Sequence, residues 1–200
     1  MKAGIWWLAG SVALLALAVS ACNTVNAGAA ERAVVDSALS RDSALARFRG
    51  SGERVMKLSA GAASKRELVG AWVAAVERSD LPALRRLVLS RAEFGWLFYP
   101  TTPQGLPPYD VAPDLLWDML ARQTDAGMDY VLKRFGSRPL RLARLDCGEA
   151  PSVEGENRLW GPCVITVVRG AGDSVSARLT GPIVEREGRF KFVSYTNDLD

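Results

Sequence analysis

The sequence contains no histidine, and this absence excludes several kinds of catalytic and metal site. A Ser-His-Asp or Cys-His arrangement, a histidine general base and a histidine metal ligand all need an imidazole ring. Cysteine is scarce too: the chain has three, and no two of them have the close spacing of a thiolate zinc site. We therefore predict no metal site, and no motif indicates a cofactor.

An excess of charge of one sign is also lacking. The chain has 25 Lys and Arg against 22 Asp and Glu, a formal net charge of +3, which does not indicate a nucleic-acid partner. Hydrophobic residues make up 48% of the 200 positions, a share typical of a folded protein. This length is sufficient for one well-packed domain and too short for two large ones.

The first residues have the pattern of a targeting segment. Lys2 precedes the apolar run Ile5–Val19, which is shorter than the roughly 20 residues of a membrane span and suits a signal-peptide core. The stretch Val19-Ser20-Ala21-Cys22 resembles the lipobox of bacterial lipoproteins. This resemblance implies that residues 1–21 are a signal peptide and that Cys22 carries acyl chains such as palmitate. The alternative is an uncleaved anchor with an incidental cysteine.

The same resemblance implies a location and a partner. Acyl chains on Cys22 would hold the protein at a membrane, because each buried methylene contributes about 0.8 kcal/mol. Asp after the cysteine retains Gram-negative lipoproteins at the inner membrane, so Asn23 implies the outer membrane, facing the periplasm, if the organism is Gram-negative. Export permits disulfides, and lipidation of Cys22 leaves an even pair. We therefore predict a disulfide between Cys147 and Cys163, at the ends of two neighbouring strands.

Beyond the signal peptide, helices are predicted first and strands last. Residues 22–63 read as a lipidated tether with an amphipathic helical arm at 31–49, and residues 64–200 as the compact domain. Ser64 and Glu67 have capping-box spacing, as do Ser90 and Glu93. A further helix is predicted from about Pro113 to Gly136, interrupted near Thr124. The β-type runs that follow are 140–147, 159–169, 175–185 and 189–195.

This order predicts an α+β fold. The N-terminal helices should pack on one face of a curved antiparallel sheet of about four or more strands. The segments ELVGAWVAAVERSDLPAL (67–84) and GPIVEREGRFKFVS (181–194) resemble the opening helices and final hairpin of the nuclear-transport-factor-2-like superfamily. That resemblance implies a cystatin-like cone, in which the sheet wraps a long helix and leaves a conical pocket. Enzymes of that superfamily often use an Asp-His pair, which a chain without histidine cannot supply.

The most unusual local feature is an aromatic stretch, 94–99, followed by a proline-rich loop. No helical or strand period explains burial of all its apolar side chains on one side. Aromatic side chains with a polar edge suit a pocket or an interface. We therefore predict that Trp96, Tyr99, Tyr109 and Trp117 form a ligand face. The competing interpretation is ordinary core packing.

No acidic side chain is assigned a catalytic role. The loop carrying Glu149, Glu154 and Glu156 is interpreted as solvated, and Asp114 as a helix-dipole partner. The sequence therefore favours a membrane-anchored envelope lipoprotein that binds a small apolar ligand or an envelope protein. The alternative is a histidine-free hydrolase or isomerase that uses Asp, Glu or Tyr in a cone-shaped pocket, and whether the chain is an enzyme stays open. A buried carboxylate with a perturbed pKa would favour this alternative.

Overall fold

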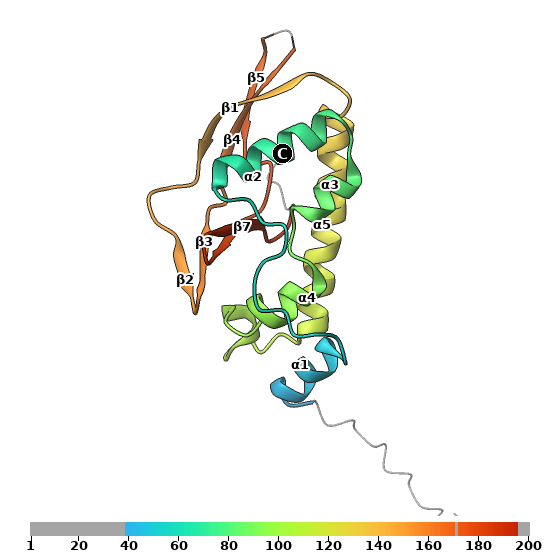
Figure 1. The fold of residues 1–200 in the computed structure, drawn as a ribbon, viewed down its shortest axis with the longest axis vertical. Coiled ribbons are helices and arrows are strands. Elements are labelled where there is room, and N and C mark those ends of the chain that lie inside the picture. The colour runs from blue at the N-terminus through green and yellow to red at the C-terminus, as the bar shows by residue number, and fades with distance from the viewer. Residues whose placement is uncertain (1–38, 171, 196–200) are drawn as a thin grey trace, which may run out of the picture. The chain divides into compact units, whose positions relative to one another are not determined.

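The computed structural model describes residues 39–170 and 172–195, which belong to one compact unit that begins at Leu39 (Figure 1). The predicted signal peptide, the predicted lipidation site Cys22 and the first part of the predicted 31–49 helix lie outside these residues. Within the described range, no helix is both long enough and apolar enough to cross a bilayer.

Helices occupy the first part of this unit. Their bounds are α1 Arg41–Arg49, α2 Lys65–Glu77, α3 Leu81–Arg86, α4 Arg91–Glu93, the π-helix η1 Phe94–Phe98, the 3-10 helix η2 Pro103–Gly105, and α5 Pro113–Phe135. The interruption predicted near Thr124 is wrong, because α5 continues through it. No proline follows the one at its first turn, and one side of the helix stays buried or half-buried from Leu116 to Phe135.

The predicted caps are present, with one difference. The Ser64 hydroxyl accepts a hydrogen bond from the Glu67 backbone N–H, as expected, but the Glu67 carboxylate accepts from Ala63 rather than from Ser64. At α4 the capping box is complete: Ser90 Oγ accepts from the Glu93 N–H, and the Glu93 carboxylate accepts from the Ser90 N–H. These bonds satisfy N–H groups that a helix start leaves without a partner.

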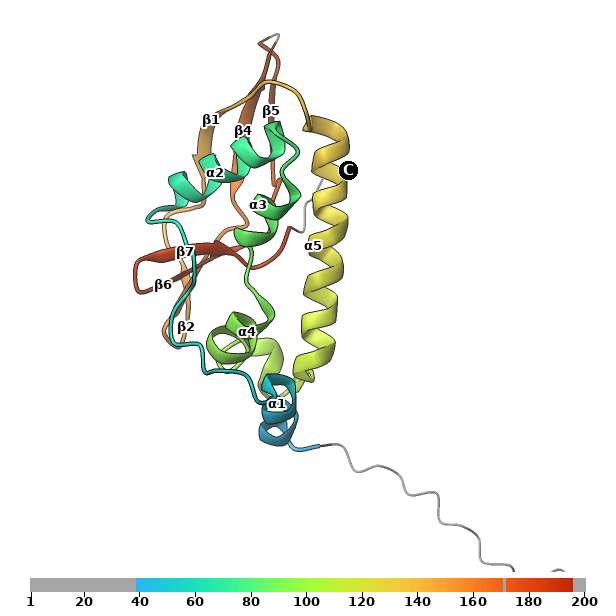
Figure 2. The same ribbon diagram turned by 45° about the vertical axis from the view of Figure 1, so that its right-hand side comes forward.

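The strands form two antiparallel sheets (Figure 2). One has the order β1-β4-β5, with bounds Leu140–Asp146, Val164–Arg169 and Ser174–Ala177. The other has the order β2-β3-β6-β7, with bounds Ser152–Glu154, Asn157–Trp160, Ile183–Arg186 and Arg189–Phe192. The α+β class is therefore confirmed, and the strands are divided between two sheets instead of one.

A Gly-Pro pair lies between the two sheets at each division. The predicted runs 159–169 and 175–185 each contain one, Gly161-Pro162 and Gly181-Pro182. Proline cannot donate a backbone hydrogen bond to a neighbouring strand, so the central strand β3 ends at Trp160, directly before the first pair. The edge strand β5 ends earlier, at Ala177, and the second pair directly precedes β6. In both runs the chain leaves one sheet before the pair and joins the other after it.

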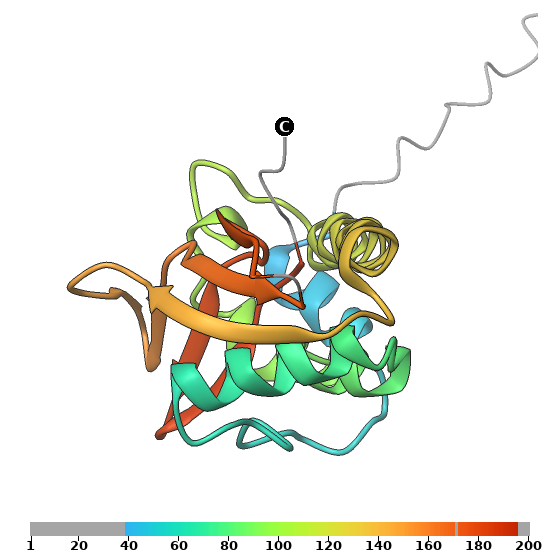
Figure 3. The ribbon, with the colours of Figure 1, turned by 90° about the horizontal axis from the view of Figure 1, so that it is seen from above.

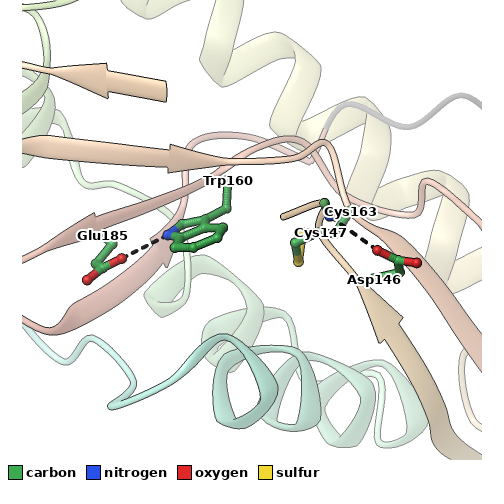
Figure 4. The surroundings of a disulfide bond; sticks show 6 residues. Asp146, Cys147, Trp160, Cys163 and Glu185 are labelled. Carbon is green, nitrogen blue, oxygen red and sulfur yellow. Dashed lines mark hydrogen bonds between the residues drawn. A yellow bond between two sulfur atoms is a disulfide. The ribbon is translucent and has the colours of Figure 1, made fainter. Parts of the chain in front are cut away.

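The disulfide between Cys147 and Cys163 is present, which confirms the predicted pair (Figure 4). Cys147 directly follows β1 and Cys163 directly precedes β4, and these strands pair at Asp146 and Val164. The segment that the bond encloses is more ordered than the solvated loop we expected, because β2 and β3 form a hairpin within it.

Two buried clusters form the core. The first joins α2, the second half of α5 and the strands around Trp72, Ile165 and Phe192. Figure 3 shows α2 lying along one face of the strands beside β1. The second cluster joins α1, η1 and the first half of α5 around Phe94.

Helix α1 belongs to the compact unit, although the sequence placed the domain start at residue 64. Leu45 and Phe48 are buried in the second cluster. The Arg41 guanidinium donates hydrogen bonds to the carbonyls of Gly105 and Pro100, at 2.6 and 2.9 Å. These contacts reach loops more than 50 residues away along the chain, so local pattern gives no sign of them.

Candidate ligand-binding surface

Five aromatic rings from α1, the η1 segment and α5 contact one another, and we call them the aromatic cluster. Phe94 lies at its centre, with ring centroids 5.4–6.0 Å from those of its neighbours. Those neighbours are Phe48 of α1, Phe98 and Tyr99 in and after η1, and Trp117 of α5. Aromatic pairs at such separations stabilise a fold beyond their buried area.

The π-helix η1 explains how the aromatic stretch packs. The Tyr99 N–H donates to the Phe94 carbonyl at 2.8 Å, a bond spanning five residues instead of the four of an α-helix. The wider turn buries Phe94, Leu97 and Phe98 while Trp96 stays half-buried. Single π-turns within helices are frequent at functional sites.

A buried ion pair fixes the start of this turn. The Glu93 carboxylate lies 2.8 Å from Lys191 Nζ, with only 1% and 3% of the two side chains exposed. It also accepts the Ser90 N–H at 2.7 Å and both donors of Ser59, at 2.6 and 2.9 Å. Burial alone would raise the pKa of Glu93, but the hydrogen bonds from Lys191, Ser90 and Ser59 together hold it below its ordinary value. Glu93 is thus a carboxylate that ties η1 to β7.

Arginine side chains cover the rings. The guanidinium carbons of Arg49 and Arg54 lie 4.0 and 5.7 Å from the Trp96 ring centroid. Arg91 lies 3.8 Å from the Phe48 ring centroid, and Arg41 lies 5.3 Å from that of Tyr99. Such cation–π contacts contribute about 0.5–1 kcal/mol where they are exposed.

Two cavities open beside these residues. The first, about 210 Å³, lies between α1 and η1, and we call it the α1 cavity. Its lining is Phe48, Arg49, Gly52, Glu53, Arg91, Ala92, Gly95 and Trp96. The second, about 220 Å³, lies along α5 and is called the α5 cavity. Trp117, Leu120 and Met128 contribute to its wall, and Arg91 lines both cavities. Each is smaller than the roughly 300–1,000 Å³ of a typical ligand pocket, so each suits one part of a small ligand.

The four aromatic residues predicted as a ligand face are placed differently by the structure. Trp96 and Trp117 are half-buried and line the two cavities. Tyr99 is 1% exposed, and its hydroxyl donates to the Val111 carbonyl at 2.8 Å. Tyr109 is 67% exposed and contributes to neither cavity. The structure therefore brings two of the four together around Arg91.

Sequence reasoning missed Arg49 and Arg91. Each stands close to an aromatic residue in the sequence, Arg49 directly after Phe48 and Arg91 three positions before Phe94. That proximity was an available signal. It did not reveal that the Arg91 guanidinium stacks on Phe48, because α1 and α4 are brought together only by the fold.

The acidic loop residues have distinct surroundings. Glu156 pairs with Arg186, and Glu149 is exposed. Glu154 is half-buried at the end of β2, and burial raises its pKa against the opposing effect of a hydrogen bond with Thr102. Asp118 pairs with an arginine on its own helix. Within the described ranges, no three acidic or cysteine side chains are grouped to hold a metal ion.

No family model matches this chain, and neither the curated proteins nor the solved structures contain a significant match to it. The resemblances to bacterial lipoproteins and to the nuclear-transport-factor-2-like superfamily therefore stay predictions.

Proposed function

We propose that this protein is a membrane-anchored envelope lipoprotein whose domain binds a small ligand or a protein partner at the two cavities. The observation that carries the binding proposal is the placement of Trp96 and Trp117. Both rings are half-buried, and each lines one of two cavities that share Arg91. Tryptophan and arginine on a well-packed support are the residues most enriched where proteins recognise partners.

The support beneath this surface favours binding over a merely exposed aromatic patch. Phe94 packs under Trp117 with ring centroids 5.4 Å apart, and the Glu93–Lys191 pair fixes the turn that carries Trp96. A site whose side chains are held by packing and by buried hydrogen bonds loses little entropy when a ligand binds.

The binding test uses full-length protein purified from its native membrane. Native mass spectrometry of the wild type should detect a retained ligand or partner, and Trp96→Ala and Trp117→Ala should each lose it. Tyr109→Ala is the matched control, since Tyr109 is an exposed aromatic residue outside both cavities. Equal retention by all three variants would contradict the site assignment.

The anchor proposal rests on the lipobox resemblance at Cys22 and has its own test. Cells are labelled with a radioactive fatty acid, and the wild type should take up label and fractionate with membranes. Cys22→Ser should lose both properties. The double variant Cys147→Ser/Cys163→Ser, which keeps Cys22, should retain them. Label on the Cys22→Ser protein would refute lipidation at this position.

One observation favours the alternative function, a histidine-free hydrolase or isomerase. Burial raises the pKa of Glu154, as a general acid working near neutral pH requires. Under this alternative, Glu154→Gln would abolish turnover of a substrate while Glu156→Gln would not. Unchanged turnover in Glu154→Gln would exclude Glu154 as the acid.

A further inference from the structure

Several arginine side chains of this protein form ion pairs with carboxylates, whereas those at the α1 cavity contact aromatic rings. Arg85, Arg122 and Arg186 each form an ion pair with an acidic residue. Among the described residues, no carboxylate lies within ion-pair distance of Arg49, Arg54 or Arg91. This surface therefore holds positive charge that the described part of the chain does not neutralise by direct pairing.

The charges are also close together. Burial lowers the pKa of Arg49 most, and the positive charges of Arg54 and Arg41 lower it further, against a smaller opposing effect of the Asp42 carboxylate. Glu53 is the acidic side chain that lines the α1 cavity. Arg49 and Arg91 line the cavity with Glu53, and Arg54 lies beside it, 5.7 Å from the Trp96 ring centroid. With Arg41 and Asp42, whose charges also act on Arg49, four guanidinium groups stand against two carboxylates, an excess of two positive charges. A bound anion would relieve this repulsion.

The guanidinium groups are held in place by their ring contacts. Arg49 stacks on Trp96 and Arg91 on Phe48, at 4.0 and 3.8 Å. Arg49 Nε donates to the Gly95 carbonyl at 2.9 Å, which fixes the orientation of this group. Among the residues that the structure describes, no acceptor is hydrogen-bonded to its two terminal nitrogens. A guanidinium that is stacked on its face presents its edge N–H groups to a carboxylate or phosphate.

We infer, building on the proposed binding function, that the α1 cavity binds the phosphate group of a phosphate monoester and that the α5 cavity holds the apolar part of the same ligand. A phosphate monoester carries about −1.5 to −2 charge at neutral pH, which matches the excess of two positive charges better than a carboxylate does. Leu120, Met128 and Trp117 supply apolar walls next to Arg91, which lines both cavities. The ester can be soluble or a membrane lipid headgroup, since the recognised chemistry is the same.

The test uses full-length protein reconstituted in phosphatidylcholine vesicles and titrated calorimetrically with phenyl phosphate. The wild type should bind it, and Arg49→Gln and Arg91→Gln should each weaken binding about tenfold, the loss of roughly one charge-assisted hydrogen bond. Arg47→Gln is the matched control, because it removes the same charge from the same helix at an exposed position that lines neither cavity. Its affinity should equal that of the wild type.

Two further arms separate the outcomes. Benzyl alcohol, a neutral probe of similar size, should bind at least tenfold more weakly than phenyl phosphate. Phosphatidic acid added to the vesicles should compete with phenyl phosphate if the natural ester is a lipid, and should leave the affinity unchanged if it is soluble; both results support the phosphate site. Equal affinity for the two probes, no binding of phenyl phosphate, or equal effects of Arg49→Gln and Arg47→Gln would overturn the inference. In that case the proposed binding function would still be supported if the native ligand were retained by the wild type and lost from Trp96→Ala and Trp117→Ala.

Discussion

At the scale of single residues, the Glu93–Lys191 pair is the most consequential contact. Both side chains are almost fully buried, where an unpaired charge is costly. The carboxylate accepts four hydrogen bonds from three residues, so its desolvation is compensated. A buried pair of this kind can contribute little net stability, yet removal of one partner leaves the other charge uncompensated.

The contribution of the Glu93 carboxylate to stability should depend on pH. The pKa of Glu93 is lower in the folded than in the unfolded protein, so the unfolded state binds its proton more readily. Its contribution is therefore complete above the ordinary glutamate value of about 4.3 and is lost as the pH falls through the lowered folded value. Urea unfolding of wild type and Glu93→Gln should show a stability difference at pH 7 that shrinks below pH 4.3. A difference independent of pH would contradict this account.

The loss of stability on substitution by alanine should increase with the burial of the aromatic residue that is replaced. Tyr99→Ala removes a buried ring together with its hydrogen bond to Val111, and we expect a loss of about 3–5 kcal/mol. Tyr109→Ala changes an exposed side chain and should alter stability by less than about 0.5 kcal/mol. Trp96→Ala should fall between the two. Thermal unfolding of the three variants measures the order of their stabilities. A large loss of stability in Tyr109→Ala would contradict the predicted order.

At the scale of elements, the contact between η1 and α1 depends on a missing side chain. A Cβ atom added at Gly95 would lie 2.8 Å from Phe48 Cε1, closer than real Cβ contacts allow. Gly95 thus permits the buried Phe48 ring to lie directly on the π-turn. The same approach brings Arg49 within hydrogen-bond distance of the Gly95 carbonyl.

Gly95→Ala should therefore loosen α1. We expect a loss of about 1–3 kcal/mol from overpacking, together with faster amide hydrogen exchange in residues 41–49. Gly70→Ala is the control, since Gly70 lies within α2 and a Cβ there would meet no atom within 4 Å. That substitution should be neutral or stabilising by up to about 1 kcal/mol. Unchanged exchange in α1 of the Gly95→Ala protein would argue against the docking described.

Elements were predictable from the sequence where their signals are local. The cap spacing at Ser90 and Glu93 predicted the start of α4, and the apolar runs predicted most strands. The partner of Glu93 was not predictable, because Lys191 lies 98 positions away. The π-turn was visible only as a failure of helical and strand periods at residues 94–99. The candidate site was predictable to the same extent. Its two tryptophans, Trp96 and Trp117, were predicted from the sequence, whereas the positions of Arg49 and Arg91 beside them became evident only from the fold.

At the scale of the whole molecule, α5 connects the two cores. It is 23 residues long, and Leu116 lies in the second cluster while Met128, Val131 and Phe135 lie in the first. A helix packed into both clusters cannot leave one without losing contacts in the other. The described unit should therefore unfold as one cooperative body, in spite of its two sheets.

The disulfide offers a test of this cooperativity, because it lies far along the chain from α1. The double variant Cys147→Ser/Cys163→Ser lacks the disulfide. Its free energy of unfolding should be lower by about 3 kcal/mol, as expected for a bond between cysteines 16 residues apart. If α5 couples the two clusters, the most slowly exchanging amides of α1 and of β4 should lose protection by the same free energy, because both exchange only through global unfolding. Hydrogen exchange measured by mass spectrometry on wild type and variant gives both values. Loss of protection confined to β1, β4 and β5 would show that the second cluster stays folded when the first opens, and would contradict coupling through α5.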